Sequence, residues 1–241
     1  MAIIEQTQTD PARTRVISPR VAGWGGLFFV VTVVLQNLTR GAVAPQNDAS
    51  IPQVLEYFVQ HRTLDLLLCT SFALGAVGLA LFLGGLMSKI AVGPARSWAY
   101  MGFAGAVGVI ALFSTLVGTE TALSVAANRP QPSLGAMDAL WSLHNGIFAV
   151  LCLSIGVALA GLGLACVAHE LLPKAFTWLA PIGGCLLAVG AIAAPLVADG
   201  SAPAVLGIML IGFLIWLIVV AFVGVRLTRE AEVAAVRRPD Q

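Results

Sequence analysis

Ionisable side chains gather at the ends of three apolar segments, and they are the residues of this sequence that could do chemistry. His61 and Asp65 are four residues apart, so a continuous helix would present both on one face. Imidazole and carboxylate groups are the ligands of zinc sites and the acids and bases of hydrolysis. The candidate site residues are His61, Arg62, Asp65, Glu120, His144 and Asn145.

This cluster has three interpretations. The first is a structural network in which Arg62 bridges Asp65 and Glu120. The second is a polar mouth for a ligand or a permeating species. The third is a metal or acid–base site built from two histidines and two carboxylates, which would make the protein a membrane enzyme. The sequence contains no compact His-Glu-x-x-His motif. We therefore expect no metal and no cofactor, and we assign no catalytic residue.

Six long apolar runs must position these side chains. They cover residues 21–38, 64–87, 98–118, 140–167, 176–197 and 205–227. Each run has about 18 residues or more, which is enough to cross a bilayer as a helix. The chain is 59% apolar and 10% charged. We predict an all-α, polytopic membrane protein whose six transmembrane helices form one bundle.

Little chain remains outside the spans. We expect an N-terminal tail at residues 1–20, a transmembrane domain at 21–227 and a C-terminal tail at 228–241. The formal net charge of +1 gives no reason to expect a nucleic-acid partner. Lys and Arg are distributed unevenly, because one set of alternate segments holds ten of them and the other holds only Arg40, Arg62 and Arg129. The positive-inside rule then places both termini in the cytoplasm.

The long first outer loop contains a short amphipathic helix near residues 51–60. Ile51, Val54, Leu55, Phe58 and Val59 follow the spacing of one helical stripe. Ser50 and Gln53 form a capping-box start. We expect the stripe to be buried, with the helix either securing the loop or covering a cavity.

The remaining motifs indicate packing. Cys69, Cys152, Cys166 and Cys185 include no Cys-x-x-Cys pair and are expected to act as small hydrophobic residues. Small residues recur at four-residue spacing in the third, fourth and fifth spans, which favours close helix contacts within the chain or in a homo-oligomer. No chain of carboxylates crosses the membrane, and no inverted repeat is evident, so a small-molecule transporter is a weaker alternative.

The chain resembles a group of actinobacterial six-span membrane proteins of the domain-of-unknown-function type. The resemblance rests on residues 20–24 (RVAGW), 54–62 (VLEYFVQHR) and 139–144 (ALWSLH), and on Pro173 with Trp178. It implies a helical bundle in a bacterial plasma membrane, and it implies no activity.

Taken together, these patterns favour a non-enzymatic membrane accessory or binding protein. It would act as a subunit of an envelope complex, through a membrane protein partner, or handle a lipophilic ligand through an outward-facing cavity with a polar mouth. The lipid bilayer is the surrounding partner in either case.

Overall fold

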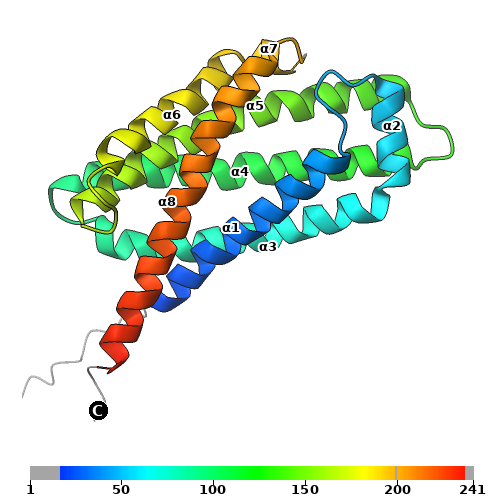
Figure 1. Ribbon diagram of the computed structural model, residues 1–241. Helices are drawn as coiled ribbons and strands as arrows, with labels where there is room; N and C mark the ends of the chain where they lie inside the picture. The colour runs from blue at the N-terminus through cyan, green and yellow to red at the C-terminus, as the bar shows by residue number, and fades with distance from the viewer. Residues whose placement is uncertain (1–16, 199, 237–241) are drawn as a thin grey trace, which may run out of the picture.

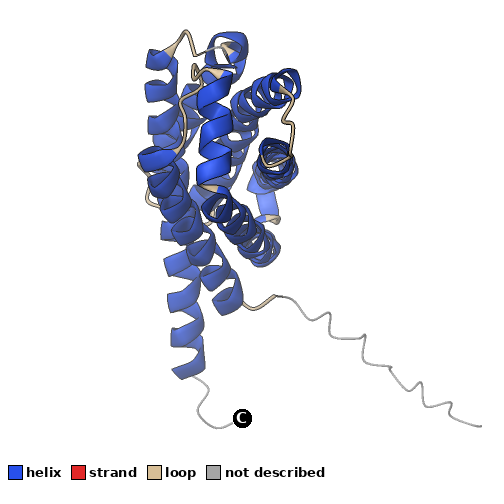
Figure 2. Cartoon of the chain, turned by 90° about the vertical axis from the view of Figure 1, so that its right-hand side faces the viewer, coloured by secondary structure: helices blue, strands red, loops and turns tan. Residues whose placement is uncertain are grey.

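The computed structural model describes residues 17–198 and 200–236, and these residues form helices joined by short loops, with no strand among them (Figures 1 and 2). The elements are α1 (Pro19–Val43), α2 (Ile51–Gln60), α3 (Arg62–Ile90), η1 (Gly93–Ala95), α4 (Arg96–Ala127), α5 (Leu134–Ala168), α6 (Phe176–Ile192), α7 (Ala194–Ala198) and α8 (Pro203–Val236). The prediction of an all-helical bundle is confirmed. The first 16 residues of the expected N-terminal tail and the last five of the C-terminal tail lie outside the described residues.

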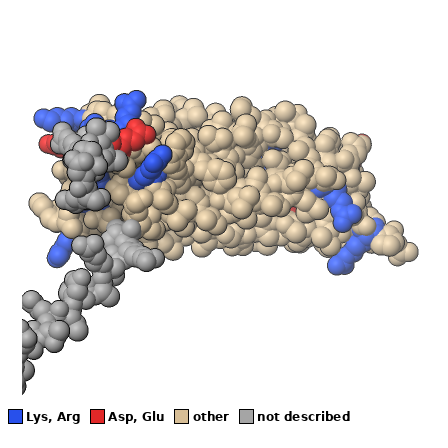
Figure 3. Space-filling view, turned by 90° about the horizontal axis from the view of Figure 1, so that it is seen from below, with Lys and Arg blue, Asp and Glu red and all other residues tan. Residues whose placement is uncertain are grey.

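The six long helices form a closed ring. Neighbours in the ring are α1, α3, α4, α5, α6 and α8, and α8 packs against α1 again. The charged side chains visible in Figure 3 lie toward the two ends of the bundle, and the surface between them is uncharged. Five helices, α1, α3, α4, α5 and α8, are long and apolar enough to cross a membrane. The protein is therefore a membrane-embedded helical bundle.

The predicted fifth span, residues 176–197, is divided in two. Helix α6 has 17 residues and ends at Ile192, and the short α7 follows from Ala194. Pro195 explains the division. Within a continuous helix its ring would clash with the carbonyl of Ala191, and it has no N–H to donate. The break places Pro195 in the first turn of α7, where a proline is tolerated.

Helices α4 and α5 approach each other more closely than any side chain would permit. A Cβ atom added at Gly102 would lie 2.3 Å from the backbone nitrogen of Leu162, and one at Gly105 would lie 2.4 Å from that of Ala158. The small residues expected at helix contacts are thus used within the chain at this crossing.

The short helix α2 forms as predicted, but its buried face is rotated. The Ser50–Gln53 capping box starts the helix, and Val54, Tyr57 and Phe58 are buried against a second apolar cluster on α4 and α5. Val59 is exposed, so its predicted burial was wrong. At about 100° per residue, Val59 lies about 140° around the helix from Val54, too far to share its face. Burial of Tyr57 sets this orientation.

The α4–α5 crossing gives a test of the packing. We expect Gly105→Ala to destabilise the protein by about 1–3 kcal/mol, because the new methyl group would meet the backbone of α5. Gly118→Ala on the same helix is the matched control, since a Cβ there meets no atom within 4 Å. Unfolding by SDS in mixed micelles would measure both variants. Equal stabilities of the two variants would contradict the close crossing.

Candidate functional site

A buried ion pair lies at the end of the bundle where α2 sits, called here the α2 end. Arg40, near the end of α1, donates from Nη1 and Nη2 to the two carboxylate oxygens of Glu120 on α4. Glu120 is 2% exposed and Arg40 is largely buried. Because a bidentate arginine–carboxylate contact fixes both position and orientation, it ties α1 to α4 across the bundle.

His144 on α5 extends this contact. Its Nε2 donates to Glu120 Oε1 at 2.9 Å, and its Nδ1 lies 3.2 Å from Asn145 Oδ1. The imidazole also stacks on the Trp141 ring, with the ring centroids 5.1 Å apart. Glu120 therefore receives donors from two different helices, which is the compensation that a buried carboxylate requires.

Asn145 continues the network to the loops. Its Nδ2 donates to the carbonyl oxygens of Asn47 and Ala198, each at 3.3 Å. Asn47 in turn donates to the carbonyl of Val197 at 3.0 Å. One amide side chain thus joins α5 to the loop between α1 and α2 and to the end of α7. We call the residues Arg40, Glu120, His144 and Asn145 the polar network.

The structure places the candidate residues from the sequence in different surroundings. Asp65, Glu120, His144 and Asn145 are brought together at the α2 end. Arg62 is exposed, and the expectation that it pairs with Glu120 was wrong, because Arg40 takes that place. Arg62 begins α3 and faces outward, whereas Arg40 lies within the last turn of α1 and faces the bundle. Arg40 follows the apolar run of residues 21–38 by two positions, so the sequence showed that it lies near a span end but not that it faces inward.

His61 belongs to another contact. Its ring stacks on Tyr57 with the centroids 5.1 Å apart, and it has no hydrogen bond to the polar network among the residues that the structure describes. Burial, together with the neighbouring Asp65 carboxylate, raises the pKa of the Tyr57 phenol to about 12. The Tyr57 ring packs in the second apolar cluster with Phe58 and Trp141.

A cavity of about 450 Å³ lies beside the polar network. Arg40, Glu120 and His144 contribute to its wall at the α2 end, with Gln36, Asn37 and Asn47. The rest of the wall is mostly apolar and comes from α4, α5 and α8: Phe113, Leu116, Phe148, Leu151, Cys152, Ile155, Leu206, Met209, Leu210 and Phe213. An apolar chamber with a few polar groups at one end is the usual form of a small-molecule site.

Helices α1 and α8 form one flank of this cavity. They touch far from the α2 end, where a Cβ at Gly23 would lie 2.3 Å from Thr228 Oγ1. From that crossing the two helices diverge toward the α2 end (Figure 1), and both contribute to the cavity wall there. The cavity therefore lies beside the parts of α1 and α8 that have diverged.

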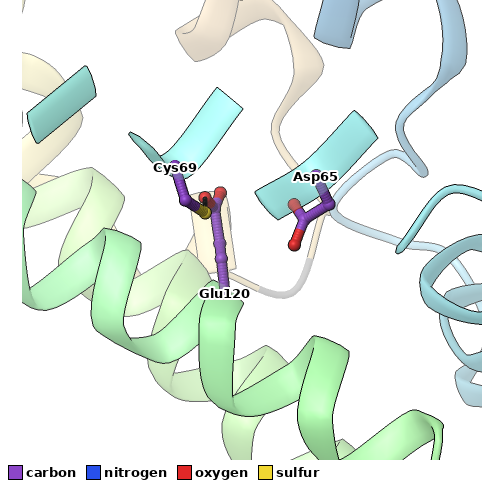
Figure 4. A group of neighbouring side chains, drawn as sticks. All are labelled: Asp65, Cys69 and Glu120. Atoms are coloured by element: carbon purple, nitrogen blue, oxygen red, sulfur yellow. Dashed lines mark hydrogen bonds between the residues drawn. The ribbon is translucent and has the colours of Figure 1, made fainter. Parts of the chain in front are cut away.

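A second group of side chains adjoins the polar network. One ligand atom each from Asp65, Cys69 and Glu120 lies within 4.8 Å of the others, and all three residues are buried (Figure 4). These are the described residues that could hold a metal ion.

No protein-family model matches the chain, and neither the curated proteins nor the solved structures contain a significant match to it.

Removal of Arg40 tests the ion pair. We expect Arg40→Met to destabilise the protein by about 3–5 kcal/mol in an SDS titration, because Glu120 would keep a buried charge without its main partner. The double variant Arg40→Met with Glu120→Met should regain part of this loss, because it removes the buried Glu120 charge, while Asp65 still lacks its nearest cation.

Arg62→Met serves as the control for that series and should unfold at the same SDS concentration as the unaltered protein. A larger loss in Arg62→Met than in Arg40→Met would overturn the assignment of the pair.

Proposed function

We propose that this protein binds a lipophilic ligand within the membrane and acts without catalysing a reaction. The observation that carries the proposal is the cavity of about 450 Å³, whose wall is mostly apolar along α4, α5 and α8. Its polar side chains lie toward the α2 end and are Gln36, Asn37, Arg40, Asn47, Glu120 and His144. Such a wall suits an amphiphile with its apolar part along the helices and its polar group at the network.

The flank between α1 and α8 supports entry from the bilayer. The two helices cross near Gly23 and Thr228 and diverge toward the cavity. A ligand that enters sideways keeps its apolar surface out of water throughout, so binding requires no transfer through the aqueous phase. A subunit or accessory role is compatible with this activity, since a loaded bundle could pass its ligand to a neighbouring membrane protein.

A membrane enzyme is the second candidate, because His144 and the buried Glu120 carboxylate line the polar end of the cavity. The hydrogen bonds weigh against it. Both Glu120 oxygens accept from Arg40, and Oε1 also accepts from His144, so the carboxylate is held as a structural acceptor. A general base needs an oxygen or nitrogen free to face a substrate proton.

We further propose that the protein resides in a bacterial plasma membrane with both termini in the cytoplasm and the α2 end outside. The support is the distribution of Lys and Arg, in which only Arg40, Arg62 and Arg129 fall in the segments at the α2 end. Reporter fusions after residue 241 and within the Pro45–Ser50 loop should report opposite sides of the membrane. A reporter that places residue 241 outside would reject this topology.

Gly207 provides a direct test of ligand binding. It lines the cavity on α8, and a Cβ there meets no atom within 4 Å, so a tryptophan has room to enter the chamber. In nanodiscs containing a diazirine-bearing fatty acid, illumination should label the buried cavity residues Leu151, Ile155 and Met209. We expect Gly207→Trp to remove most of this labelling without loss of folded protein.

Gly118→Trp is the matched control, because Gly118 is also unobstructed but lies outside the cavity wall. It should leave labelling of the three buried residues unchanged. Labelling confined to lipid-exposed residues in the unaltered protein, or undiminished cavity labelling in Gly207→Trp, would reject the proposed function.

A further inference from the structure

Asp65 is the most unusual ionisable residue of the bundle. Its side chain is 0% exposed, and neither carboxylate oxygen has a hydrogen-bond partner. The nearest cation is Arg40, whose Nη2 lies 3.9 Å from Asp65 Oδ1. At this distance Arg40 provides a nearby positive charge to Asp65 and no hydrogen bond. A buried carboxylate in this state is costly unless another group compensates it.

The unpartnered oxygens face two further ligand groups. Asp65 and Cys69 lie one turn apart on α3, and Glu120 faces them from α4 (Figure 4). One ligand atom from each of the three lies within 4.8 Å of the others. Cys69 Sγ is 3.6 Å from Glu120 Oε2. A tetrahedral zinc ion at its usual bond lengths holds its ligand atoms about 3.3–3.8 Å apart, so small side-chain adjustments would close the site.

We propose that Asp65, Cys69 and Glu120 form a binding site for a divalent metal ion of the zinc type. One thiolate and two carboxylates make a mixed sulfur and oxygen set, which suits Zn²⁺ and is a poor match for Ca²⁺ or Mg²⁺, whose ligands are all oxygen. The three protein ligands leave one position of a tetrahedral ion for a further ligand.

Charge balance supports this assignment. With the metal bound and Cys69 ionised, the charges of the ion and Arg40 equal those of the thiolate, Asp65 and Glu120. Binding replaces the thiol proton, which is released to solvent, so one proton leaves for each ion that enters. A buried cluster with no net charge avoids the desolvation penalty that the unpartnered Asp65 carboxylate carries alone.

Arg40 and His144 then become the outer support of the site. Each hydrogen bonds to a Glu120 oxygen, and a carboxylate oxygen with two lone pairs can accept a hydrogen bond and bind a metal at once. Ligating carboxylates in metal sites are commonly held this way. Glu120 also lines the cavity, but Asp65 and Cys69 do not, so substitutions at these two residues test the metal site without altering the cavity wall.

Cobalt(II) can report on the site because a cobalt–thiolate bond absorbs in the near ultraviolet. The full-length protein, treated with a chelator and purified in mild detergent, would be titrated with Co²⁺ and then with Zn²⁺. We expect one Co²⁺ per chain, a thiolate-to-cobalt band, and loss of that band when Zn²⁺ displaces the cobalt. Zn²⁺ should also raise the SDS concentration at which the protein unfolds.

Two variants and one control decide the outcome. Cys69→Ser should abolish the band, and Asp65→Asn should weaken Co²⁺ binding at least about tenfold. Cys166→Ser, a buried cysteine on α5, should bind like the unaltered protein. If Co²⁺ gives no thiolate band, or if the band survives in Cys69→Ser, the metal site is refuted. If Asp65→Asn only stabilises the metal-free protein, a proton at Asp65 provides the compensation instead. Either result would leave the cavity labelling experiment unaffected.

Discussion

A charged side chain in the membrane must find its compensation inside the protein, and the α2 end of this bundle depends on that constraint. Glu120 is buried on α4, and Arg40 and His144 reach it from α1 and α5. Asn145 extends these contacts to the loop between α1 and α2 and to the end of α7. The position of α2 follows, because Tyr57 and Phe58 pack on the surface that these helices present. Loss of the charge compensation at Glu120 would therefore disturb several elements together.

The helix pairs on opposite sides of the ring, α4 with α5 and α1 with α8, pack in different ways. Helices α4 and α5 meet backbone to backbone at Gly102 and Gly105, where no side chain intervenes. Helices α1 and α8 make a similar close contact at Gly23 and Gly224 and diverge from there toward the α2 end (Figure 1). The cavity lies where they have separated, and the polar network closes its far end. The chamber is mostly apolar, with polar side chains of α1, α4 and α5 at the α2 end, and this lining supports the proposed binding of an amphiphile from the bilayer.

Helical periodicity and hydropathy were sufficient to predict the bundle, because backbone groups in lipid leave few alternatives to long helices. The capping box at Ser50 likewise predicted where α2 starts. The arginine partner of Glu120 was not predictable in the same way, since Arg40 and Arg62 both lie near span ends and only the three-dimensional packing decides which one faces inward. Cys69 shows the same limit. Its spacing from Asp65 was visible in the sequence, but its approach to Glu120 depends on how α3 packs on α4.

A structure determined in lipid nanodiscs would test the central claim most directly, which is that a polar network closes an apolar chamber accessible from the bilayer. We expect Arg40 and His144 to hydrogen bond to Glu120. We also expect elongated density for a bound ligand along the wall formed by Phe113, Ile155 and Phe213. Helices α1 and α8 should remain apart at that depth. If the two helices instead pack against each other up to the α2 end and their side chains fill the chamber, the cavity and the proposed binding function would both be contradicted.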